Sequence, residues 1–262
     1  MATLLTHGYD DYEVFAFAQC YTHGHTETWH QHPYIQLIHT LTGVIRVETT
    51  EGTWICPPGR GLWIPAGKKH ALHVSGQGNI RGVWIKANAR KNLATHCSVV
   101  NISALLRELI CAALNIDEPI QTNSRNERLL QLILDEVTLL PSLAFHLPEA
   151  RSPALIQLCQ KIRDNLAFDW TLHHAAATAA MSSKTLSRHF QKELNVNFAQ
   201  WIRQAKLLQA MTELSQNKPI LHIALDLGYD SPSAFSAMFK RETAMTPSEY
   251  MVQFSQPLDH KR

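Results

Sequence analysis

The sequence predicts an α+β chain of more than one domain: an N-terminal antiparallel β-barrel with helices after it, then an all-helical C-terminal domain of two helix-turn-helix units. Two observations support this fold class. In the first ninety residues, short segments rich in Val, Ile, Thr and Trp are separated by Gly or Pro about every 8 to 12 residues. In the last third, residues 171–193 and residues 219–242 are versions of one another.

The apolar segments of the first part are typical of the strands of a small barrel or jelly roll. They are YIQLIHTL, GVIRVETT, TWICPP, GLWIPA and ALHVS. Each is short and ends at a turn-forming residue, so we expect a separate strand from each. The predicted barrel domain covers residues 1–98.

Helical periodicity follows the barrel in two segments, Asn101 to Leu114 and Ser124 to Leu140. We assign them to a helical segment over residues 99–141. The next stretch, PSLAFHLPEARSP, contains three prolines and no sustained period. It predicts a linker over residues 142–152, followed by the helical domain over residues 153–256.

Helix starts in the C-terminal domain are marked by residues that cap a helix or occupy its first position. These signals divide residues 152–254 into roughly seven helices. One long helix, from Phe198 to Leu214, should connect the two copies of the repeat. The start signals are Ser152-Pro153, Thr171, Ser182, Pro219, Ser231-Pro232 and Thr246-Pro247.

The repeat itself has a defined register. An offset of 48 aligns Ala176 with Ala224, and after one inserted residue an offset of 49 aligns Ser182 with Ser231. Each copy then consists of a short helix, a tight turn and a second helix that begins at a serine. This is the helix-turn-helix layout, whose second helix enters the DNA major groove. If both units bind one face of a duplex, they should lie about 34 Å apart.

The charge distribution agrees with DNA binding by the second part. Residues 1–150 carry 11 Lys and Arg against 13 Asp and Glu, and residues 151–262 carry 13 against 9. Phosphate contacts require such a basic excess. We find no signal-peptide pattern or membrane span, and the five cysteines are scattered. We therefore expect a cytoplasmic protein with reduced thiols and no membrane attachment.

The first recognition helix should bury the stripe Leu186, Phe190 and Leu194, spaced at i, i+4 and i+8. Among the outward residues, Arg188 can pair with guanine and Gln191 with adenine, while Lys and Ser more often bind phosphate. The predicted DNA contacts of this unit are Ser183, Lys184, Ser187, Arg188, Gln191 and Lys192.

The second recognition helix has fewer side chains that can read bases. Its core stripe is Phe235 and Phe239, and Ala237 occupies the position that matches Arg188. We predict that the first unit supplies most base discrimination and that the second mainly positions the DNA backbone. The predicted contacts of the second unit are Ser231, Ser233, Ser236, Lys240 and Arg241.

Histidines are concentrated in the barrel, which contains nine of the fifteen. His30 and His32 would share one face of a strand with Gln36, because alternate residues project to the same side. His70 follows a turn at Pro65 to Gly67 that we expect to close a hairpin. Three imidazoles and an amide oxygen could bind a divalent metal. Alternatively, these residues shape a polar pocket or form hydrogen bonds within the barrel, and Tyr34 and Trp63 are further candidates for a pocket lining.

The barrel segments HQHPYIQLIHTLTGVIRV and GLWIPAGKKH resemble the two cupin motifs. The resemblance implies metal ligands at His30, His32, Gln36 and His70. Gln36 departs from the pattern, because the family usually has a glutamate there. A divalent metal would then be an optional group, and no cofactor is required.

Residues 152–254 resemble the AraC family of bacterial transcription regulators. The resemblance lies in AATAAMSSKTLSRHFQKEL and in IALDLGYDSPSAFSAMFKRETAMTPSEY. Two positions that are glycine in the family are Ala180 and Ala244 here, so we expect the turns at these positions to be built differently.

The two resemblances together imply a regulator, with no catalytic residues, that binds double-stranded promoter DNA and senses a small-molecule or metal effector. They also imply a homodimer formed through Ser103 to Leu114 or Ser124 to Leu140, and RNA polymerase as a further partner. Two alternatives remain open. One is a metal-dependent cupin enzyme that uses the barrel histidines, and the other is an architectural DNA binder without an effector.

Overall fold

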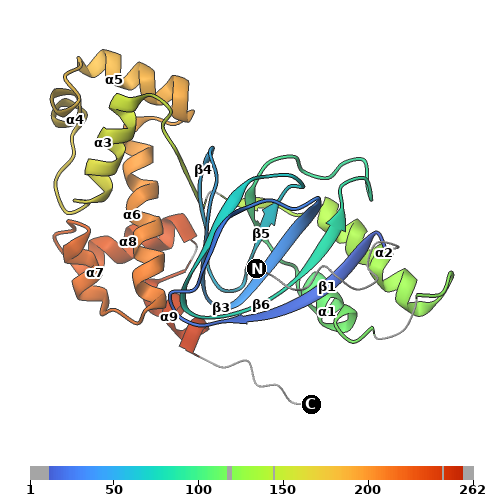
Figure 1. The fold of residues 1–262 in the computed structure, drawn as a ribbon. Coiled ribbons are helices and arrows are strands. Elements are labelled where there is room, and N and C mark those ends of the chain that lie inside the picture. Colours follow the sequence, from blue (N-terminus) through green and yellow to red (C-terminus); the bar gives the residue numbers. More distant parts are fainter. Residues whose placement is uncertain (1–11, 117–119, 144, 244, 256–262) are drawn as a thin grey trace. The chain divides into compact units, whose positions relative to one another are not determined.

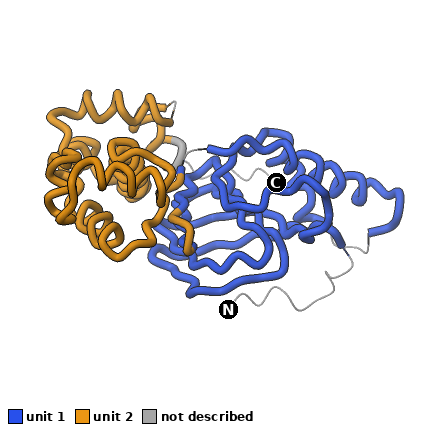
Figure 2. The backbone as a smooth tube through the Cα atoms, turned by 90° about the horizontal axis from the view of Figure 1, so that it is seen from above, with its two compact units in different colours: residues 1–49, 54–145, 260–262 blue, residues 50–53, 146–259 orange. Residues whose placement is uncertain are grey.

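The computed structural model describes residues 12–116, 120–143, 145–243 and 245–255 (Figure 1). Within these residues, one unit comprises residues 12–49 and 54–145, and the other comprises residues 50–53 and 146–255 (Figure 2). The first unit contains the antiparallel sheet and the second the helix-turn-helix repeat, which confirms the predicted fold class. No helix in the described part of the chain is long and apolar enough to cross a bilayer.

The sheet of the first unit has the strand order β1-β6-β3-β5-β7-β8, with β2 on β6 and β4 on β3. Pairing is antiparallel between β1 and β6, β2 and β6, β3 and β6, β3 and β5, β5 and β7, and β7 and β8. The strands are β1 (Val14–Tyr21), β2 (Thr26–His30), β3 (Tyr34–Glu48), β4 (Gly52–Cys56), β5 (Arg60–Ile64), β6 (His70–Lys86), β7 (Ser98–Asn101) and β8 (Ser142–Leu143).

Strand β3 merges two segments that the sequence predicts as separate strands. Gly43, at φ 71°, does not end the strand, although the register shifts on both sides of Thr42. Such irregularities bend a strand and increase its twist. A Cβ at Gly43 would lie 2.9 Å from the Gln77 carbonyl oxygen, so a larger residue does not fit.

The turn at Pro65 to Gly67 does not close a hairpin, contrary to the sequence prediction. Strands β5 and β6 both pair with β3 and not with each other. Strands β1 and β2 and the second half of β6 were also missed. In β1 the apolar residues Val14, Phe15 and Phe17 are all buried, so both faces are apolar and the sequence does not alternate.

Helices α1 (Ala104–Ala113) and α2 (Arg125–Thr138) begin at Ser103 and Ser124, whose hydroxyls accept backbone N–H bonds. Both helices lie beside β1 (Figure 1). Their apolar faces share one core with the sheet, made of Val14, Ile35, Leu37, Trp63, Val83, Ile85, Leu106, Ile110, Ile133, Leu134 and their neighbours. The segment predicted as helical over residues 99–141 therefore begins with a strand, β7, and its helices are part of the first unit's core.

The predicted linker over residues 142–152 is not irregular. It contains β8, which pairs with β7, and β9 (His146–Pro148). The boundary between the units falls inside it, after residue 145. Proline excludes a residue from the middle of a sheet but not from an edge strand or a strand end, and Pro148 is the last residue of β9.

The second unit contains seven α-helices in its described residues, and all six predicted helix starts are confirmed. The connecting helix α6 covers nearly the predicted span, and its Trp201 is fully buried. The helices are α3 (Pro153–Arg163), α4 (Leu172–Thr178), α5 (Ser183–His189), α6 (Phe198–Ser215), α7 (Ile220–Asp226), α8 (Pro232–Thr243) and α9 (Pro247–Ser255), with a π-helical turn, η2 (Phe190–Leu194), after α5.

The turns of the two helix-turn-helix units have the same construction. The Met181 N–H donates to the Ala176 carbonyl and the Tyr229 N–H to the Ala224 carbonyl, both at 2.9 Å. Ala180 has φ 53° and the matching Gly228 has φ 71°. The expectation of a differently built turn before Met181 is therefore wrong, because alanine adopts the left-handed conformation here. Ala244 lies outside the described residues.

Candidate functional site

The first recognition helix presents a polar face beside a buried stripe. Leu186 and Phe190 are completely buried and Leu194 is 4% exposed, which confirms the predicted stripe. Among the described residues, the Arg188 guanidinium has no hydrogen bond or ion pair within the protein, so it is free to bind an external group. Of the predicted contacts, Lys184, Ser187, Arg188, Gln191 and Lys192 are exposed, and Ser183 is half-buried.

The recognition segment changes from α-helix to π-helix at Phe190. Gln191 and Lys192 lie in this wider turn, so their side chains point in directions that differ from those of a regular helix. The sequence carries no signal for this change, because the spacing of buried residues fits either helix. Single π-helical turns are frequent at functional sites.

The second recognition helix offers fewer free polar groups. Phe235 and Phe239 are fully buried, as predicted. Arg241 forms an ion pair with its neighbour Glu242 at 3.1 Å, which occupies part of its guanidinium. Of the predicted contacts, Ser233, Lys240 and Arg241 are exposed, and Ser231 and Ser236 are half-buried.

Glu193 connects the first recognition segment to the start of α3. Its Oε2 accepts the backbone N–H groups of Arg151 and Ser152 at 3.1 and 3.0 Å, and its Oε1 lies 3.2 Å from His189 Nδ1. The Ser152 hydroxyl makes no capping bond, and the carboxylate of Glu193 instead fixes the two N–H groups immediately before α3. Burial alone would raise the pKa of Glu193, but these hydrogen bonds lower it to about 2.

A depressed carboxyl pKa contributes stability above the unfolded pKa, and the contribution is lost as the pH falls toward the folded pKa. We therefore expect the free energy of unfolding of the wild type to fall by about 2 kcal/mol more than that of Glu193→Gln between pH 4.5 and pH 2. Urea unfolding at a series of pH values measures this difference. Parallel pH profiles for the two proteins would contradict it.

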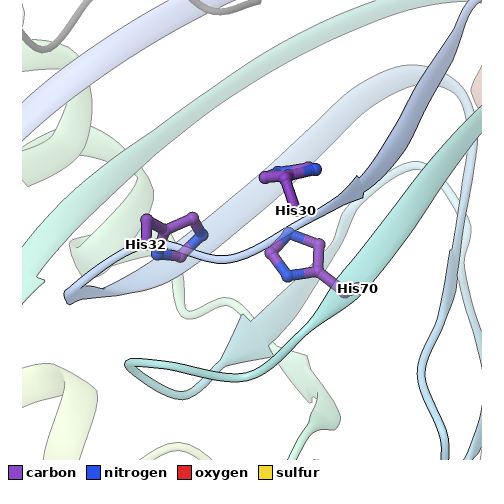
Figure 3. Close-up of side chains that lie close together, drawn as sticks. All are labelled: His30, His32 and His70. Carbon is purple, nitrogen blue, oxygen red and sulfur yellow. The ribbon is translucent and has the colours of Figure 1, made fainter.

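Three histidines form a second candidate site, in the first unit. His30 ends β2, His32 lies in the connection to β3, and His70 begins β6 (Figure 3). One ring nitrogen of each lies within 4.8 Å of those of the other two. His70 is fully buried and His32 is 6% exposed.

The predicted reason for this grouping is wrong, although the residues are the predicted ones. His32 does not lie on a strand, so strand alternation does not align it with His30. Instead, His30 lies opposite His70 in the β2–β6 pair, and the Gly67 N–H donates to the His32 carbonyl at 2.8 Å. Pairing in the sheet and a turn contact thus bring the three rings together.

Each of the three imidazoles is held in the same way, by a backbone carbonyl two residues from it. A carbonyl oxygen only accepts, so each Nδ1 carries a hydrogen and a neutral ring presents its lone pair at Nε2. Metal-binding histidines are oriented by this kind of contact. The bonds are His30 Nδ1 to Thr28 O at 2.8 Å, His32 Nδ1 to Tyr34 O at 2.6 Å and His70 Nδ1 to Lys68 O at 2.8 Å.

Burial keeps two of the rings neutral. It lowers the pKa of His70 to about 4, although the bond to the Lys68 carbonyl opposes the shift. Burial also lowers the pKa of His32. His70 Nε2 is buried and has no hydrogen-bond partner among the described residues. Such a nitrogen costs free energy unless it binds a further group, so the residues present fit a metal ion.

The other predicted pocket residues divide into two groups. Gln36 Oε1 lies 3.3 Å from His32 Nε2, so Gln36 belongs to the cluster, and Tyr34 joins it through its carbonyl. Trp63 does not belong to it. It lies opposite Leu37, one residue along β3 from Gln36, and so faces the helices α1 and α2 from the other side of the sheet.

Two residues of this site were absent from the predicted set. The Trp84 ring makes an edge-to-face contact with His32, with centroids 4.5 Å apart. Glu27 Oε2 lies 3.6 Å from His30 Nε2. The sequence leaves open whether Trp84 lines a pocket or packs the sheet, and the register of β6 against β3, in which it lies opposite Gln36, decides this.

Comparison with known proteins covers both units. Residues 11–137 match the AraC-like ligand binding domain, and residues 175–253 match a helix-turn-helix domain. The chain is 31% identical to the HTH-type transcriptional regulator NimR of Escherichia coli over 230 residues, which is 88% of this chain and 84% of NimR.

One further relative and one solved structure are similar over different spans. The regulatory protein SoxS of Salmonella typhimurium is 41% identical over 76 residues, which is 29% of this chain and 71% of SoxS. The structure of ToxT from Vibrio cholerae has a TM-score of 0.41 and 11% identity, and covers 94% of this chain and 100% of ToxT. The extent of the match to NimR, with family matches in both units, shows that this chain belongs to the AraC family of DNA-binding transcription regulators.

Proposed function

We propose that this regulator responds to a divalent transition-metal ion held by the Nε2 atoms of His30, His32 and His70. The supporting observation is the arrangement of three imidazoles whose Nδ1 atoms are all fixed by carbonyls and whose rings each bring one nitrogen close to the other two. His70 Nε2 is also buried without a hydrogen-bond partner among the described residues. Imidazole nitrogen suits zinc, copper and nickel better than magnesium or calcium.

Three imidazoles leave a coordination position for water or a small ligand. Gln36, beside His32, offers an amide oxygen near that position. An organic effector that binds next to the same histidines without a metal is the competing outcome. A turnover assay on the loaded protein addresses the enzyme alternative.

The proposed regulator acts as a homodimer in the cytoplasm, with RNA polymerase as a partner at the promoter. The inward faces of α1 and α2 pack in the first unit's core, so a dimer contact would use their outward faces, which include three exposed leucines. Leu105 is 49% exposed, Leu132 is 40% exposed and Leu139, at the end of α2, is 75% exposed. Metal binding and DNA binding would then influence each other reciprocally.

The test uses the full chain and a DNA duplex selected by it from a random pool. Chelator-treated protein is compared with protein loaded with Zn²⁺, Ni²⁺, Co²⁺ or Cu²⁺. We expect at least one ion to change the Kd for the selected duplex by about 5- to 150-fold. His30→Ala, which alters the most exposed of the three histidines, should keep the metal-free affinity and lose the metal response. If no ion changes the Kd of the wild type, the metal response is excluded.

A further inference from the structure

The four proposed metal ligands, His30, His32, His70 and Gln36, include no carboxylate. Imidazole and amide ligands bring no negative charge to a metal ion, so a divalent ion held by the three histidines and Gln36 would leave a net charge of +2 next to buried groups. Unpaired charge in such surroundings is costly. A carboxylate close to the ring of one ligand would offset that cost, and the chain places one there.

Glu27 reaches His30 because of an irregularity in β2. Residues three apart on a regular strand point to opposite faces. Here Glu27 lies opposite Leu72 and His30 opposite His70, with a register shift between them. Leu72 and His70 are two residues apart on β6 and share a face, so the extra residue in β2 puts Glu27 and His30 on that face as well.

The carboxylate of Glu27 is held in place from its other side. The Tyr21 hydroxyl donates to Glu27 Oε1 at 2.8 Å, and His25 Nε2 lies 3.9 Å from the same oxygen. Burial is the main cause that raises the pKa of Tyr21, and the charge of Glu27 raises it further. The Tyr21 hydroxyl therefore stays protonated and remains a hydrogen-bond donor. With Oε1 engaged, Oε2 faces His30 Nε2 at 3.6 Å.

We infer that Glu27 supplies the negative charge of the metal site, in place of the neutral Gln36, and sets its affinity for a divalent cation. This inference rests on the proposed metal response. Glu27 Oε2 lies on the same side of the His30 ring as Nε2, the nitrogen assigned to the ion, so Glu27 acts on the ion through its charge and through the orientation of that ring. In this role it is a positioning residue.

The test measures the Kd of Zn²⁺ and Co²⁺ for the full chain by competition with a chromophoric chelator. Glu27→Gln should weaken binding by about 10- to 100-fold, the range seen when a partner of a metal ligand is removed. The matched control is Glu48→Gln, since Glu48 lies 3.7 Å from His73 Nε2 and its side chain is 34% exposed, against 25% for Glu27. The control should bind within about twofold of the wild type.

A compensating variant separates charge from folding. Glu27→Gln combined with Gln36→Glu should regain most of the lost affinity, and the visible absorption of bound Co²⁺ should report a carboxylate ligand in this variant. Absence of Zn²⁺ or Co²⁺ binding by the wild type would count against the proposed metal response itself. Two outcomes would overturn the role of Glu27 but not the metal response, provided that the wild type binds these ions. One is an unchanged affinity in Glu27→Gln, and the other is a loss of affinity in Glu48→Gln as large as that in Glu27→Gln.

Discussion

Gly228→Ala should lower the free energy of unfolding of the helix-turn-helix unit by about 3 kcal/mol, from a backbone clash and an unfavourable φ together. A Cβ at Gly228 would lie 2.3 Å from the Ala167 carbonyl oxygen. The residue also has φ 71°, where a side chain is strained. The clashing atom is a backbone atom of the segment between α3 and α4, so it cannot turn aside as the end of a flexible side chain could.

The first copy provides the reciprocal change. Ala180 already has φ 53° and is exposed, so Ala180→Gly should raise the free energy of unfolding by about 1 kcal/mol through relief of strain. Chemical denaturation of both variants, followed by circular dichroism, measures the two shifts. Opposite signs are the expected result. A destabilising Ala180→Gly would mean that the left-handed turn is not strained.

Arg188→Ala should weaken binding to a selected operator by up to about 3 kcal/mol, more than a hundredfold, and should relax the sequence preference at one base pair. Arg188 is exposed on α5 and has no partner within the described residues, so its guanidinium can form a bidentate pair with a guanine. The second copy has Ala237 at the matching position and cannot make this contact.

Ser236→Ala on α8 is the matched variant. It should reduce affinity by a factor of a few without changing the preferred sequence, because hydroxyls more often contact phosphate. Binding-site selection with the wild type and both variants measures affinity and preference together. A comparable loss of preference in both variants would contradict the unequal roles of the two units.

Local signals predicted the helical domain well. A serine, threonine or proline before an apolar repeat marks a helix start locally, and all six predicted starts are present, although Ser152 makes no capping bond. The buried stripes of α5 and α8 also follow from spacing alone. The π-helical turn η2 was not predicted, because its spacing of buried residues also fits an α-helix.

The sequence predicted which residues form the histidine cluster but not how the fold brings them together. His30, His32, Gln36 and His70 do lie together in the structure, although strand alternation does not bring them together. Trp63 was assigned to the wrong side of the sheet, since a side chain's face depends on register, which distant strands set.

The sequence alone therefore determined the repeat, its caps and its likeness to a family of DNA-binding regulators, because each depends on residues close together in the chain. Tertiary structure decided the left-handed turn at Ala180, the side of the sheet that Trp63 occupies and the approach of Glu27 to His30. These features depend on strand register and on one extra residue in β2. A one-residue change in register moves a side chain to the opposite face of a sheet, and no local pattern records it.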